Sequence, residues 1–311
     1  MDKKKNQWKA WLYLLPAIVI LAIFTVWPII NTIRMSFLKD YSGLAATGGA
    51  SFKFGFDNFV NVARYKRFLT YLGNTMLLTV LTVPISTMLA LLIAVALNSI
   101  KWLQKVLQTI FFLPYVTNSI AIGMVFMAMF TMIGGSQAPI SVGIINKIFQ
   151  AFGGKPINWV NDGSTKLANM TVMIIYIVWN ALPFKILVLL GGLQSVNKQY
   201  YDAAKVDGTS RFRTFWRITV PLLSPMIAYV VITGFIGGFK EYSSIVGIFG
   251  DTMGPTGDAR RLGTIVGFIY ENISGDQVNQ GRASAAALTL FVIIFAVTMI
   301  NLYVSKKKVH Y

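Results

Sequence analysis

Long runs of apolar residues constrain the fold of this chain more than any other feature. Six such runs lie at about residues 11–30, 72–97, 106–130, 167–190, 218–239 and 283–304, and Lys185 is the one charged residue within them. About 20 helical residues cross roughly 30 Å of hydrocarbon, so each run is long enough to span a bilayer. The sequence therefore predicts an all-α integral membrane protein with six transmembrane helices.

The composition excludes a soluble globular protein. Charged residues make up 13% of the 311 residues, whereas a soluble domain carries roughly 25%. The net charge of +17 could indicate nucleic-acid binding, but the basic residues are spread over segments that flank the apolar runs. We therefore expect contact with membrane lipid and none with nucleic acid. Since the chain has no Cys, disulfides and thiolate metal sites are excluded.

The distribution of Lys and Arg predicts the orientation. With the N-terminus inside, the inner segments hold 14 basic residues in about 52, and the outer segments hold 13 in about 120. Because basic residues accumulate in short cytoplasmic segments, we expect both termini in the cytoplasm. The domains are then a basic N-terminus at 1–10, a six-span region at 11–305 and a tail at 306–311. A cleaved signal peptide is the alternative for the first run, but that run is longer than a signal peptide's apolar part of roughly 7–15 residues.

A charged stretch at 197–221 separates the fourth and fifth runs. Its residues predict a helix, a break at Gly208 and a second helix capped by Thr209 or Ser210. Two adjacent small residues, Ala203 and Ala204, leave room for another protein surface. The orientation places this stretch in the cytoplasm, where it could dock into a cleft of a partner protein.

The same stretch resembles a known signature. Asp202-Ala203-Ala204, then Gly208, then Ile218-x-Val220-Pro221 is similar to the EAA motif of permease subunits of binding-protein-dependent ABC importers. Asp202 stands for the usual Glu, and Val220 for the usual Leu. The flanking Asp207 and Phe215 resemble the carbohydrate-uptake group, which includes the maltose-transporter permeases. The resemblance implies a coupling helix that contacts an ATPase through Asp202, Ala203, Ala204, Asp207, Gly208, Phe215, Ile218 and Pro221.

The resemblance also implies the partners. No Gly-rich phosphate-binding motif is present, so ATP and Mg would be bound by two separate cytoplasmic ATPase subunits. A second related permease subunit would complete the pathway, in a bacterial cell membrane. An extracellular solute-binding protein would deliver a sugar or oligosaccharide to the outer loops at 131–166 and 240–282. These long loops could instead be plain tethers.

Polar residues at membrane depth mark a candidate pathway, because they usually face a cavity or a packed interior. Pro183 predicts a break in the fourth span. The resemblance places the substrate pathway at Asn180, Phe184, Lys185, Phe239, Lys240, Glu241 and Tyr242. Two alternatives stay open: Lys185 could snorkel along lipid, and Lys240 could pair with Glu241 at the outer rim. Gly234-x-x-x-Gly238 is a helix-packing pattern.

Other functions have less support. An importer of an anionic sugar or another small polar solute would fit if Lys185 or Lys240 lacks a counter-charge. A polytopic membrane enzyme would need clustered acidic or His residues, whereas the 11 acidic residues here are scattered. A secondary transporter would favour inverted repeats and intramembrane carboxylates, for which Glu241 is the only candidate. We expect a permease that is not an enzyme.

Overall fold

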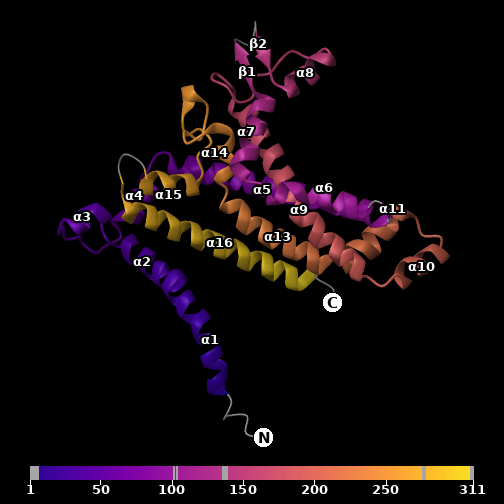
Figure 1. Ribbon diagram of the computed structural model, residues 1–311, viewed down its shortest axis with the longest axis horizontal. Helices are drawn as coiled ribbons and strands as arrows, with labels where there is room; N and C mark the ends of the chain where they lie inside the picture. Colours follow the sequence, from indigo (N-terminus) through magenta and orange to yellow (C-terminus); the bar gives the residue numbers. More distant parts are fainter. Residues whose placement is uncertain (1–6, 101, 103, 135–138, 275–277, 309–311) are drawn as a thin grey trace. The chain divides into compact units, whose positions relative to one another are not determined.

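The computed structural model describes residues 7–100, 102, 104–134, 139–274 and 278–308, and most of these are helical (Figure 1). Parts of the predicted N-terminal segment, 1–6, and of the predicted tail, 309–311, lie outside the described residues. Four apolar runs form long helices, in agreement with the sequence. They are α1–η1–α2 (Gln7–Leu21, Ala22–Val26 and Trp27–Ser36), α5 (Phe68–Ser99), α9 (Lys166–Ser195) and α16 (Gln280–Lys308).

The third and fifth runs are bent helix pairs rather than straight helices. The third run forms α6 (Gln104–Val116) and α7 (Ser119–Phe130), which meet at 98°. The break forms because the Asn118 side chain accepts from the backbone N–H groups of Ile120 and Ala121 and so begins a new helix. The fifth run bends by 69° between α12 (Val220–Leu222) and α13 (Ser224–Phe239). Within the described residues, four helices are thus long and apolar enough to span a membrane, and the number of spans rises to six if each bent pair counts as one.

The break predicted at Pro183 is wrong. Helix α9 continues from Lys166 to Ser195, and Pro183 lies buried inside it. Proline is tolerated in transmembrane helices where neighbouring groups satisfy the backbone that it disturbs. The breaks occur instead at Asn118 and Leu223.

The segments between the long helices form short elements. The segment at 131–166 contains a short helix, α8 (Ile144–Ala151). It follows a two-stranded antiparallel hairpin of β1 (Met132–Gly134) and β2 (Pro139–Val142), a small departure from the all-α prediction. The remaining elements are α3 (Gly43–Thr47), α4 (Asp57–Arg64), α10 (Gln199–Val206), α11 (Arg211–Thr214), η2 (Phe215–Thr219), α14 (Ser243–Phe249), η3 (Thr256–Asp258) and α15 (Ile265–Ser274).

The chain divides into two compact units, each with its own contacts. One unit runs to Leu69 and includes Phe268–Phe291; the other comprises Thr70–Gly267 and the residues from Val292. In the first unit the buried Asn58 amide donates to the carbonyls of Ser36 and Leu38, at 3.0 and 2.8 Å. These bonds fix the turn that follows α2.

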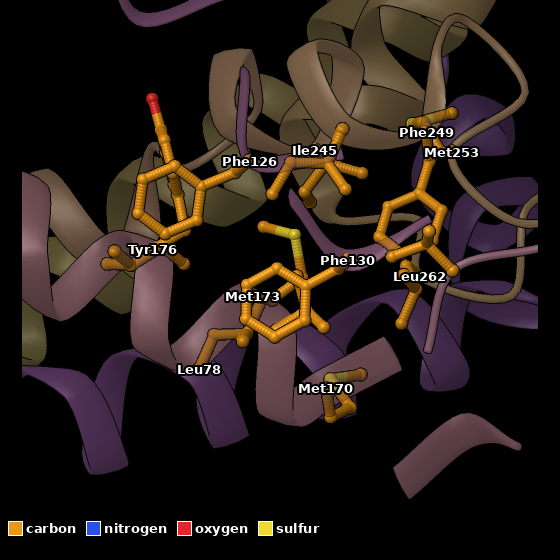
Figure 2. Close-up of a cluster of buried hydrophobic side chains, with 14 residues drawn as sticks. Leu78, Phe126, Phe130, Met170, Met173, Tyr176, Ile245, Phe249, Met253 and Leu262 are labelled. Atoms are coloured by element: carbon orange, nitrogen blue, oxygen red, sulfur yellow. The ribbon is translucent and has the colours of Figure 1, made fainter. Parts of the chain in front are cut away.

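The second unit contains two clusters of buried apolar side chains. Figure 2 shows the first, in which side chains converge from α5, α7, α9 and α14, among them Leu78, Phe126, Met173 and Ile245. The second cluster joins α5, α9 and α13 through residues such as Ala90, Leu189 and Val230. Together the clusters fix α5, α9 and α13 around buried polar side chains such as Ser86 and Lys185.

Candidate functional site

The motif-bearing segment ends helix α10 in a defined turn. Gly208 has a φ of +65°, in the left-handed region that favours glycine, at the break that the sequence predicted. Its N–H donates to the carbonyl of Lys205, and the N–H of Thr209 donates to that of Ala204. This pair of bonds is the Schellman motif, which satisfies carbonyls at a helix end. Ser210, rather than Thr209, then caps α11 by accepting from the N–H of Arg213.

The predicted coupling residues divide into an exposed and an anchored group. Asp202, Ala203, Asp207 and Gly208 are exposed. Ala204 is buried, so it is Ala203 of the small pair that is open to another surface. The other three, Phe215, Ile218 and Pro221, are partly buried, and Phe215 packs against the second apolar cluster.

Large apolar side chains accompany the exposed group. Val206 is 88% exposed and Phe212 is 75% exposed, and Tyr200 and Trp216 are also exposed. The Asp202 carboxylate accepts from the Lys205 ammonium at 3.0 Å, but this surface pair contributes little to stability. Exposed apolar side chains beside polar ones are typical of a surface that binds another protein.

A cavity of about 300 Å³ lies among α5, α6, α9 and α13. Four of the seven predicted pathway residues line it: Asn180, Phe184, Lys185 and Glu241. The other three do not. Phe239 is buried, Lys240 is exposed, and Tyr242 packs against the first apolar cluster.

Lys185 is held inside the protein. Its side chain is 3% exposed, and its Nζ donates to Ser86 Oγ at 2.7 Å, Thr87 Oγ1 at 2.9 Å and the Val83 carbonyl at 3.2 Å. A snorkelling side chain would keep its head group in water, so that alternative is wrong. All three N–H groups of the ammonium donate to neutral oxygens of α5.

Glu241 lines the same cavity. Its Oε1 accepts from the backbone N–H of Ser244 at 3.2 Å, which fixes the carboxylate at the start of α14. Within the described residues Glu241 makes no ion pair with Lys240 or Lys185. The rim ion pair considered from the sequence is therefore wrong.

One wall of the cavity is aromatic. The Phe184 ring stacks on Tyr115, with centroids 5.9 Å apart and planes at 18°, and both rings line the cavity. Beside them, the Asn180 amide makes no hydrogen bond to any residue that the structure describes. Ring faces and a free amide are suited to a sugar, which offers both an apolar face and hydroxyl groups.

The α5 wall was missed from the sequence, although a signal was present. Thr75, Thr79, Thr82 and Ser86 recur at spacings of four, three and four, which places them on one helix face. All are buried, and each hydroxyl donates to the carbonyl four residues earlier. The oxygen lone pairs of this stripe therefore remain available to neighbouring helices, as Lys185 demonstrates.

The Gly pattern on α13 faces this stripe. A Cβ on Gly238 would lie 2.9 Å from Thr79 Cγ2, and one on Gly234 would lie 3.1 Å from Val83 Cγ1. Both glycines also line the cavity. They therefore permit close packing of α13 on α5, as predicted.

The described residues contain no group of three or more Asp, Glu or His side chains placed to hold a metal ion. No metal ligand set is therefore assigned within them.

Comparisons with known proteins agree with this architecture. Residues 83–310 match the family "Binding-protein-dependent transport system inner membrane component". The chain is 28% identical to an arabinooligosaccharide transport system permease protein of Bacillus subtilis, over 95% of this chain and 88% of that one. It is 27% identical to a lactose transport system permease protein of Rhizobium radiobacter, over 96% and 94%.

A solved structure has the same fold. It is a chain of a bacterial alginate ABC transporter in complex with an alginate pentasaccharide-bound periplasmic protein. The TM-score is 0.79 at 22% identity, over 97% of this chain and 96% of that one. The chain therefore belongs to the family of inner-membrane components of binding-protein-dependent transport systems, and it is a multi-pass permease subunit of a bacterial ABC importer rather than an enzyme.

Proposed function

We propose that this permease forms half of the translocation pathway for a sugar or oligosaccharide. The cavity beside Phe184 supports this proposal, because it combines stacked rings with the Asn180 amide, which makes no hydrogen bond to the residues that the structure describes. The similar permeases of B. subtilis and R. radiobacter belong to arabinooligosaccharide and lactose transport systems. A second, related permease completes the pathway, and an extracellular solute-binding protein delivers the cargo to the outer loops.

The exposed face of α10 is the proposed contact with the ATPase subunits. These two cytoplasmic subunits bind ATP and Mg, and their conformational change reaches the membrane helices through α10. The support is the exposed group of motif residues together with the apolar side chains of Val206 and Phe212. The chain then leads through the partly buried Phe215, Ile218 and Pro221 to α13, and Phe215 packs against the second apolar cluster, which includes Val230 of α13. A movement of α10 is therefore transmitted to a helix that lines the cavity.

Co-purification tests the assembly. We expect the tagged chain, extracted from its native membrane, to carry an ATPase and a second permease with it. Asp202→Lys reverses an exposed charge on α10 and should reduce the recovered ATPase at least tenfold. Asp251→Lys makes the same change at an exposed position in the loop at 240–282 and should leave recovery unchanged. Normal ATPase recovery in Asp202→Lys would contradict the proposed contact.

A further inference from the structure

The cavity holds a buried cation, Lys185, with no counter-charge beside it among the described residues. The Lys185 ammonium donates to three neutral oxygens of α5, and no described carboxylate lies within ion-pairing distance of it. Burying an unpaired charge is costly, and such charges in membrane segments usually serve a function. Hydrogen bonds to neutral oxygens fix the ammonium but leave its charge uncompensated.

The Lys185 ammonium is part of the cavity and does more than pack α9 against α5. Lys185 and Ser86 both line the cavity, as does the Asn180 amide, which has no described hydrogen-bond partner. An anionic group in the cavity would find direct N–H donors on Asn180 and a fixed positive charge on Lys185. In a low-dielectric site, a fixed charge discriminates strongly between a charged ligand and a neutral one.

Glu241 lines the same cavity without pairing with the cation. A carboxylate accepts hydrogen bonds but cannot donate them. Glu241 therefore suits the hydroxyl groups of a sugar and repels its anionic groups. The cavity is therefore lined by one cationic and one anionic side chain.

From these contacts we infer that the cargo is an acidic sugar, with a carboxylate held at Lys185 and Asn180 and hydroxyl groups held at Glu241. This inference rests on the proposed function, since it specifies the cargo of the same cavity. It assigns Lys185 as a specificity-determining residue.

The test uses the complete complex in lipid nanodiscs and two matched probe pairs: digalacturonic acid with its dimethyl ester, and glucuronic acid with its methyl ester. Each pair keeps the sugar and removes the charge. We expect equilibrium binding to favour the acid at least tenfold in one pair or both. The inference is wrong if neither acid binds more tightly than its ester, or if no probe binds at all.

Variants separate charge recognition from a structural role. Lys185→Met removes the ammonium, while the Ser86 and Thr87 hydroxyls keep their own acceptors, the Thr82 and Val83 carbonyls. We therefore expect Lys185→Met to fold and to lose the preference for the acid. Glu241→Gln should increase the preference, and Lys240→Met, at an exposed position outside the cavity, should leave it unchanged.

The outcomes are distinguishable from failure of the proposed function. If Lys185→Met keeps the wild-type ratio of acid to ester affinity, Lys185 is a structural cross-link between α9 and α5, and the inference is wrong. A purely structural role would lower the melting temperature of the complex without changing that ratio. Failure of the proposed function would appear instead as a chain that recovers neither an ATPase nor a second permease.

Discussion

At the scale of single residues, Gly208 provides the sharpest prediction. Its φ of +65° is strained by about 1–2 kcal/mol for most residues with a Cβ, and by more for a β-branched one. A Cβ there would meet nothing within 4 Å, so the cost is one of backbone conformation and not of collision. We expect Gly208→Val to insert into the membrane but to recover at least tenfold less ATPase on purification. Gly208→Asn should be close to wild type, because Asn tolerates this region.

Gly153 supplies a matched control for that prediction. It has a φ of +80°, open space where a Cβ would lie, and the same pair of terminal hydrogen bonds at the end of α8. Gly153→Val should therefore impose a similar local cost while ATPase recovery stays normal. Equal loss of recovery in both variants would show a general defect and contradict the role of α10.

At the scale of elements, the crossing of α5 and α13 depends on Gly238. A Cβ there would lie 2.9 Å from Thr79 Cγ2, so Gly238→Ala should destabilise the protein by about 1–3 kcal/mol through overpacking. The measurement is thermal unfolding of the purified chain in detergent. Gly237→Ala is the control, since a Cβ on that neighbouring glycine meets nothing within 4 Å.

A second substitution tests whether this contact is the cause. Thr79→Ala removes the atoms nearest to a Cβ on Gly238. Among the described residues, the Thr79 hydroxyl bonds only to the Thr75 carbonyl of its own helix. We expect the double variant Gly238→Ala/Thr79→Ala to recover most of the stability lost by Gly238→Ala. If the losses of stability in the two single variants simply add in the double variant, the effect of Gly238→Ala does not come from its contact with Thr79.

At the scale of the whole molecule, the topology is the prediction to test. Six spans with both termini in the cytoplasm would place Ser210 inside and Asp258 and Ser141 outside. Because the chain has no Cys, single Cys substitutions at these positions can be labelled without background. An impermeant thiol reagent applied to intact cells or spheroplasts should modify Cys at 258 or 141 and leave Cys at 210 unmodified. The reverse pattern would overturn the orientation.

The sequence by itself determined the class of this protein and its motif. The lengths of the apolar runs identified α5, α9 and α16. Polar groups are costly in hydrocarbon, so a helix that spans a membrane must have a long apolar sequence. The left-handed Gly208 was also predictable, because a glycine after a run of helix formers is a local signal.

Only the tertiary structure decided what the spans do with their polar groups. The sequence does not distinguish whether Lys185 faces lipid, water or protein. Its hydrogen bond to Ser86 depends on how α9 packs on α5. The bend at Asn118 and the continuity through Pro183 were likewise beyond the sequence, since backbone groups in an apolar setting are satisfied by whichever neighbours the packing supplies. The sequence of a helix that is apolar on all sides has no periodicity that identifies its buried face. The cavity and the charged residues that line it are therefore defined only by the packing of the helices.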